Sequence, residues 1–117
     1  MSCAVGRAVL RVIEQDGLQK NCLERGEQLL EGFRKLQEKH DIIGDVRGHG
    51  LMLGVEFVKD RKTKEPATKE FLEIFEDCKN HNLLLGKGGL YGNVMRVKPP
   101  MCITKEDVEF TLEVLDQ

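Results

Sequence analysis

The stretch GDVRGHGLMLGVE, residues 44–56, decides the fold of this chain. Its first half is punctuated by glycines, and its second half alternates between apolar and other residues, as a half-buried β-strand does. Successive side chains of a strand point to opposite faces of the sheet. One face of this predicted strand is therefore apolar and faces a core, and it consists of Leu51, Leu53, Val55 and Phe57.

Helices are predicted on both sides of this strand. Apolar residues recur with the period of an amphipathic helix in residues 3–15, 18–40 and 69–81. Thr104-Lys105-Glu106-Asp107 resembles a capping box and opens a last helix. Gly26 lies inside the second helix, at a cost of about 1 kcal/mol relative to alanine. Close packing against another helix would explain so small a residue there.

Three further strands are predicted, over residues 42–46, 83–85 and 94–98, and residues 86–93 form a flexible glycine loop between the last two. Strands bracketed by helices in this order predict an α+β fold. We expect a single domain over residues 1–117, with a small, mostly antiparallel sheet of three to four strands that helices cover on one face.

Composition excludes several classes of protein. The 117 residues carry a net charge of −2 without a basic cluster, which argues against a nucleic-acid-binding protein. No apolar run approaches the length of about 20 residues that crosses a bilayer, so we expect no membrane span. Neither the cysteines nor the histidines show the spacing of metal ligands, so we expect free thiols and no metal site. The four cysteines are Cys3, Cys22, Cys78 and Cys102.

Arg96 is the most informative single residue. It lies between Met95 and Val97 in a predicted strand and so points away from the face that those two residues share. A guanidinium is a planar set of donors that matches a carboxylate with two hydrogen bonds, so Arg96 on a rigid strand can hold an anionic substrate. The alternative is a solvated arginine on an exposed face.

Arg47, Gly48 and Gly50 form a second candidate group. The glycines allow the backbone to approach a ligand or another chain closely, and the neighbouring arginine can bind an anion. In the alternative interpretation, Arg47 pairs with Asp45 or Glu56 and the glycines form a turn or bulge before the strand.

Lys87 lies among glycines in the sequence GKGG, residues 86–89. The stretch lacks the pattern of a phosphate-binding P-loop. A lysine amine can form a Schiff base when it is desolvated, but flanking glycines favour a mobile lysine in water.

Two segments resemble the class III, fold-type I pyridoxal-phosphate aminotransferases. Residues 44–56 are similar to that family's G-[DE]-V-R-G-x-G-L-[ML]-x-G-[IV]-E stretch, and residues 95–101 are similar to its x-R-[IVF]-x-P-P-L stretch. Residues 3–14 resemble the segment in which the chain leaves the large domain for the small one. Within the family, residues 45–52 and 101–105 look most like the mitochondrial alanine–glyoxylate aminotransferase group.

The resemblance implies the C-terminal small domain of a transaminase, with residues 1–16 as a linker helix from a large domain that this chain lacks. It implies that Arg96 binds a substrate carboxylate and that Arg47, Gly48 and Gly50 have a supporting role. The cofactor would be pyridoxal phosphate, but the Schiff-base lysine, the phosphate-binding turn and the acid facing the pyridine nitrogen have no counterpart in this chain. We therefore expect the 117 residues alone to be inactive.

For the parent enzyme, the resemblance implies a mitochondrial homodimer that transfers an amino group from an amino acid such as alanine to a keto acid such as glyoxylate or pyruvate. This chain shows no targeting segment. The alternative function is a non-catalytic module that binds carboxylates or another protein.

Overall fold

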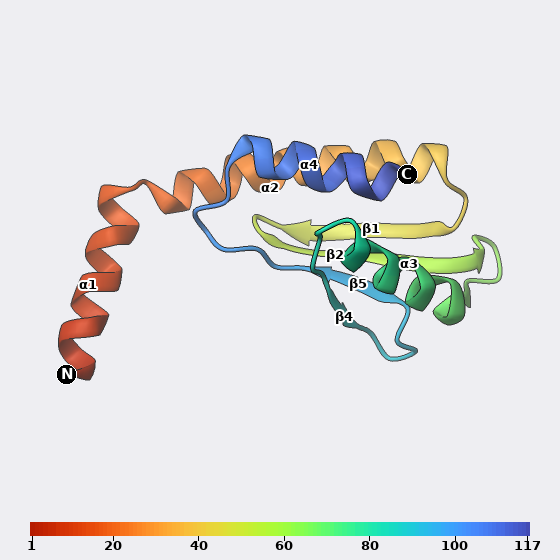
Figure 1. Cartoon of the computed structure of the whole chain (residues 1–117), viewed down its shortest axis with the longest axis horizontal. Coiled ribbons are helices and arrows are strands. Elements are labelled where there is room, and N and C mark those ends of the chain that lie inside the picture. Colours follow the sequence, from red (N-terminus) through yellow and green to blue (C-terminus); the bar gives the residue numbers. More distant parts are fainter.

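The computed structural model describes residues 1–117 and consists of four helices and one sheet (Figure 1). The elements follow the chain as α1 (Ser2–Gln15), α2 (Leu18–Lys39), β1 (Ile43–His49), β2 (Met52–Asp60), β3 (Glu65–Pro66), α3 (Thr68–Asn80), β4 (Gly86–Gly88), β5 (Val94–Val97) and α4 (Lys105–Asp116).

The sheet has the strand order β1-β2-β5-β4, and the two-residue β3 pairs with the end of β2. Every pairing between neighbours is antiparallel. Helices α2, α3 and α4 supply buried residues to the core on one side of the sheet, and α2 and α4 lie side by side there (Figure 1). The predicted α+β class and the predicted antiparallel sheet are confirmed.

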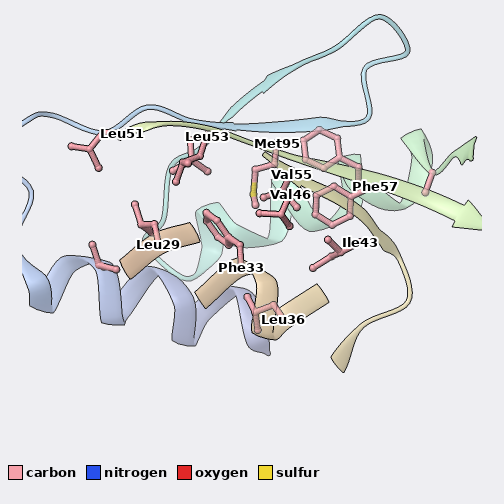
Figure 2. Packing of buried hydrophobic residues seen from close by; sticks show 14 residues of the cluster. Leu29, Phe33, Leu36, Ile43, Val46, Leu51, Leu53, Val55, Phe57 and Met95 are labelled. Atoms are coloured by element: carbon pink, nitrogen blue, oxygen red, sulfur yellow. The ribbon is translucent and has the colours of Figure 1, made fainter. Parts of the chain in front are cut away.

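The core lies between this helical layer and the sheet (Figure 2). Phe33 of α2 and Phe71 of α3 are 1% and 0% exposed, and the ring of Phe71 lies 5.1 Å from that of Phe57 on β2. Burial of side chains of this size stabilises a fold by about 1.5–3 kcal/mol each. The predicted apolar face is buried as a whole: Leu53, Val55 and Phe57 of β2 lie in this core, as does Leu51 in the turn before β2.

The hairpin between β1 and β2 accounts for Gly26. Gly50 occupies the first position of a two-residue turn with φ 56°, a backbone conformation that suits glycine. A Cβ atom on Gly26 of α2 would lie 2.1 Å from the carbonyl oxygen of Gly50. The prediction that Gly26 packs against another helix was therefore wrong, because the close neighbour of α2 at this point is the turn of the hairpin.

The region between α3 and β5 also differs from the prediction. Residues 83–85 are not a strand, and the strand β4 instead uses Gly86–Gly88 from the predicted glycine loop. Asn93 at the end of that loop is 1% exposed, and its Nδ2 atom donates a hydrogen bond of 2.8 Å to the carbonyl oxygen of Phe57. The glycines of residues 86–93 predict a flexible loop. The pairing of β4 with β5 and the buried hydrogen bond of Asn93 instead hold this segment in place.

Helix α1 projects away from the rest of the molecule (Figure 1). None of its residues is buried, and Val5, Val9 and Leu10 are more than half exposed. The radius of gyration is 15.9 Å, whereas a compact domain of this length has a value of about 13 Å. The long axis of 49 Å reflects this projection. No helix combines the length and the apolar character that a membrane span requires.

Candidate functional site

Arg96 lies on the face of the sheet opposite the helices. Its neighbours in β5, Met95 and Val97, are 2% and 6% exposed and belong to the core, whereas Arg96 is exposed. Alternation along the strand thus places Arg96 as predicted. The strand is central in the sheet, because β2 pairs with one side of it and β4 with the other. Arg96 therefore extends from a rigid part of the fold.

A row of four residues crosses the open face of the sheet at the level of Arg96. The strand pairings place Arg47 opposite Gly54, Gly54 opposite Arg96, and Arg96 opposite Gly86. A Cβ atom on Gly86 would lie 3.4 Å from Nε of Arg96, so the arginine side chain lies against this glycine. Two glycines flanking Arg96 in the row leave space around its guanidinium.

That space is part of a shallow depression of about 380 Å³. Arg47, Gly48, Gly54, Arg96 and Lys98 line it, together with Met52, Leu53 and Val97. Three of the lining residues are cationic and none is acidic. The depression is therefore suited to an anion rather than to a cation or an apolar ligand.

The three cations differ in their partners. Nη1 of Arg47 donates hydrogen bonds of 2.7 Å to Oδ2 of Asp45 and 3.1 Å to Oε2 of Glu56. These contacts, the one with Asp45 foremost, raise the pKa of the Arg47 guanidinium. Arg96 and Lys98 form no ion pair within the chain. The unpaired positive charge of the depression is therefore concentrated on β5 and the residue that follows it.

Gly48 and Gly50 have a backbone explanation in this structure. Gly48 has φ 145°, and a Cβ atom on it would lie 2.3 Å from the carbonyl oxygen of Met52. Gly50 makes the turn that joins β1 to β2. The glycines therefore belong to the backbone of the hairpin, and Arg47 pairs with Asp45 and Glu56, as in the alternative interpretation of the sequence. Gly48 nevertheless also lines the depression beside Arg96.

Lys87 lies apart from this site. It pairs with Met95 in the sheet, which places its side chain on the covered face, and its Nζ atom lies 5.7 Å from the centre of the Phe75 ring. A cation over an aromatic ring is stabilised by the charge distribution of the ring. The structure therefore holds Lys87 on the side of the sheet opposite Arg96.

Sequence reasoning missed the two glycines that flank Arg96. The sequence predicts no role for Gly54, and it predicts a loop over residues 86–93, which include Gly86. Their importance follows from the cross-strand register, which brings residues 54, 86 and 96 together. No signal in a single sequence specifies that register, although glycines in otherwise regular strands indicate a close approach.

The sequence profile of the class III aminotransferase family matches residues 1–117. The chain belongs to this family. A mitochondrial alanine–glyoxylate aminotransferase 2 homolog 2 of Arabidopsis thaliana is 53% identical over 116 residues, which is 99% of this chain and 24% of that protein. Mitochondrial alanine–glyoxylate aminotransferase 2 of Homo sapiens is 46% identical over 115 residues, 97% of this chain and 22% of that protein. The predicted resemblance to the family and to this group is confirmed.

Solved structures of aminotransferases contain the same fold. A Bacillus anthracis aminotransferase superposes with a TM-score of 0.91 at 32% identity, covering 97% of this chain and 26% of that one. An amine transaminase from an uncultivated Pseudomonas species, solved in its PLP-bound internal aldimine form, has a TM-score of 0.86 at 30% identity, covering 97% of this chain and 26% of that one. The present chain spans about a quarter of the length of its relatives.

Class III aminotransferases use pyridoxal phosphate, but the residues around Arg96 do not form a site for it. The cofactor requires a lysine amine, an acid facing the pyridine nitrogen and donors for its phosphate. Lys98 and two arginines line the depression, but no carboxylate is present there to face a pyridine nitrogen. This segment presents a depression lined by cationic residues and by no acidic ones. No group of three or more histidine, cysteine or acidic side chains is arranged to hold a metal ion.

Proposed function

We propose that this chain is the C-terminal small-domain part of a transaminase that moves an amino group from an amino acid such as alanine to a keto acid such as glyoxylate or pyruvate. The single observation that carries the proposal is Arg96, an unpaired guanidinium on a rigid strand that faces away from the core of a class III aminotransferase fold. The relatives named alanine–glyoxylate aminotransferase support the choice of substrates.

In this proposal, Arg96 binds the carboxylate that amino and keto acids share. A guanidinium holds a carboxylate through two parallel hydrogen bonds, which defines the orientation of the substrate as well as its position. Orientation of the reacting groups is a large part of enzymatic rate enhancement. The substrate carbon next to the carboxylate is thereby held at a defined height above the sheet.

Arg47, Gly48 and Gly50 support this site without binding the substrate themselves. Arg47 forms ion pairs with Asp45 and Glu56, so its positive charge is neutralised within the chain. It helps to hold the wall of the depression in place. Gly48 and Gly50 set the path of the hairpin that forms the edge of the depression.

The remainder of the enzyme supplies what this chain lacks. We propose a large domain in the same polypeptide and a second subunit, with pyridoxal phosphate as an electron sink for the amino-group transfer. The linker helix over residues 1–16, which exposes its apolar side chains, leads toward that domain. Mitochondrial relatives support a mitochondrial location. In this proposal the 117 residues alone do not catalyse transamination.

A chimeric enzyme tests the proposal. The segment of the Arabidopsis relative that matches this chain is replaced by residues 1–117, and alanine–glyoxylate transamination is measured. We expect activity, and we expect Arg96→Met to lower kcat/KM about 100-fold, the scale of a lost pair of charge-assisted hydrogen bonds. Lys87→Met, on the other face of the sheet, should leave the rate unchanged. A folded, dimeric chimera whose activity does not depend on Arg96 would contradict the role of this residue.

The second candidate is a non-catalytic module, favoured by the observation that the chain has its own core and exposes Arg96 without a partner. Such a module binds small carboxylates or another protein. Strong transamination by the chimera excludes this alternative. An inactive chimera that still contains the cofactor, together with carboxylate binding by the 117-residue chain, would favour it.

A further inference from the structure

The helical layer does not close over the sheet completely. Helix α4 packs against α2, whereas α3 packs against β2 and β5, and a cavity of about 260 Å³ remains between the two groups. Its walls come from α2, α3, α4 and the covered face of the sheet. The cavity therefore lies on the side of the sheet opposite Arg96, and it shares no lining residue with the depression there.

The interior of this cavity is apolar and partly aromatic. Phe33 of α2 and Phe57 of β2 line it from opposite layers of the core (Figure 2), together with Met95 of β5. Eleven of the fifteen lining residues are hydrophobic. Cys78 is one of them, and burial, followed by the charge of Asp77, raises the pKa of its thiol, so the thiol stays neutral at neutral pH. Phenyl rings and a thioether pack well against another aromatic ring.

The size of the cavity matches a ligand of one or two rings. An apolar cavity of about 150 Å³ in a protein interior holds benzene. The present cavity, at about 260 Å³, is larger than that, but it is smaller than the sites of about 300–1,000 Å³ that bind drug-sized molecules. A small molecule therefore fits, whereas a peptide or a long chain does not.

The polar groups at the entrance include three hydrogen-bond acceptors. Nδ1 of His81 lies 3.0 Å from the carbonyl oxygen of Asp77. Because a carbonyl oxygen only accepts, Nδ1 carries the hydrogen, and Nε2 of the neutral ring is left as an acceptor. Nε2 of His40 likewise donates over 3.1 Å to the carboxylate of Asp116, which leaves its Nδ1 as an acceptor. The third acceptor is the carboxylate of Asp77, which also repels an anionic ligand.

We propose that this cavity binds a small neutral aromatic molecule that carries one hydroxyl or ring N–H donor, such as a phenol or an indole. The ring occupies the space between Phe33, Phe57 and Met95, and the donor faces Nε2 of His81 at the entrance. This site lies on the covered face of the sheet, and the inference does not depend on the role proposed for Arg96.

The test is an NMR titration of the methyl groups of the 117-residue chain with indole. We expect saturable shifts at Ile74, Met95 and Leu115, which line the cavity, and none at Val5, which is exposed on α1. Indene has the same two rings without the N–H group and should bind about three- to tenfold more weakly, the contribution of one hydrogen bond. Benzoate, which Asp77 repels, should also bind more weakly than indole.

Variants that fill the cavity test its location. Val114→Phe enlarges a side chain of the cavity wall and should weaken indole binding about tenfold or more, because the ring loses its space. Val9→Phe makes the same substitution on the exposed face of α1 and should leave the affinity unchanged. Circular dichroism establishes that both variants fold, and Ile74→Phe on α3 replaces Val114→Phe if the latter does not. Indole binding that a folded, filled variant retains in full overturns the inference.

The class of ligand is tested at the entrance. His81→Leu should reduce the affinity for indole to that for indene without changing the affinity for indene. His49→Leu, which removes a histidine that does not line the cavity, should retain the preference for indole. A preference that survives His81→Leu, or benzoate that binds as tightly as indole, overturns the assignment of a neutral donor ligand. If neither indole nor indene shifts the methyl signals of the cavity, the site itself is refuted.

Discussion

The two faces of the sheet carry opposite kinds of residue on the same strands. On the covered face, Val55 is 0% and Met95 2% exposed, and both lie in the core. On the open face, Gly54 and Arg96, their neighbours in sequence, line a depression with three cationic residues and no acidic one. Because a strand alternates, the buried Val55 and Met95 are each adjacent to a residue of the open face. Stability and recognition are therefore separable in this domain, and substitutions on the two faces should have different effects.

The largest effect is expected on the covered face. Phe71→Ala should lower the free energy of unfolding by about 3–5 kcal/mol, because it leaves a cavity beside Phe57 in the fully buried core. Arg96→Ala on the open face should change it by about 0.5 kcal/mol or less. Denaturant unfolding followed by circular dichroism measures both. If Phe71→Ala does not fold, the milder Phe71→Leu provides the comparison, and equal losses for the two faces would refute the separation.

A smaller effect is expected where the helical layer meets the hairpin. Gly26→Ala gains about 1 kcal/mol of helix propensity but places a Cβ atom 2.1 Å from the carbonyl oxygen of Gly50. Overpacking of this kind costs about 1–3 kcal/mol, so we expect net destabilisation. Gly6→Ala in α1 meets no atom within 4 Å and should be stabilising. Thermal unfolding of the two variants should therefore shift in opposite directions, and a shared sign would contradict the close approach of α2 to the turn.

The charged groups of the open face should matter little for stability. Glu56→Gln removes one of the two carboxylates that hold Arg47, and an exposed ion pair contributes about 0–1 kcal/mol. Glu73 on α3 has no ion pair, so Glu73→Gln is a control for the loss of charge alone. Chemical denaturation of both variants in low and in high salt is the measurement. A loss well above 1 kcal/mol for Glu56→Gln would show that the open face contributes to stability after all.

The smallest effect is expected at Asp116, at the edge of the helical layer. Hydrogen bonds from Lys39 and then from His40 lower the pKa of the Asp116 carboxyl below its ordinary value of about 3.9. A carboxyl with a lower pKa in the folded state stabilises the fold above its ordinary pKa. This contribution disappears as the pH falls through the folded-state value.

Lys39→Met should move that pKa back toward the ordinary value, as an NMR titration of the side-chain carboxyl would show. Lys35→Met removes a lysine of the same helix that forms no ion pair and should leave the titration unchanged. An identical Asp116 pKa in the wild type and in Lys39→Met would contradict the ion pair between Lys39 of α2 and Asp116 of α4.

Some parts of this fold could be predicted from the residues because they follow local periodicity. The apolar alternation of β2 has a period of two residues, and the helical stripe that contains Leu29 and Phe33 has a period of 3.6. The capping box at Thr104 is a local hydrogen-bonding motif. The exposed face of Arg96 follows from the same alternation. The resemblance to class III aminotransferases rests on two motifs whose order and spacing are visible in the sequence.

Other features depend on which segments meet, and no local pattern contains that information. Gly26 is small because of Gly50, which lies 24 positions away in the sequence, and Gly86 becomes a strand residue because it pairs with Arg96. Arg47 could have bound an anion or paired with an acid, and the register of β1 against β2 places Glu56 within its reach. These outcomes depend on long-range pairing.

The sequence by itself determined the class of fold, the residues of the core and the direction of Arg96, because burial and strand alternation act on neighbouring residues. Only the tertiary structure decided that Arg47 is neutralised while Arg96 and Lys98 remain unpaired in one depression. The physical reason is that the charge of a surface is a property of side chains brought together from different strands.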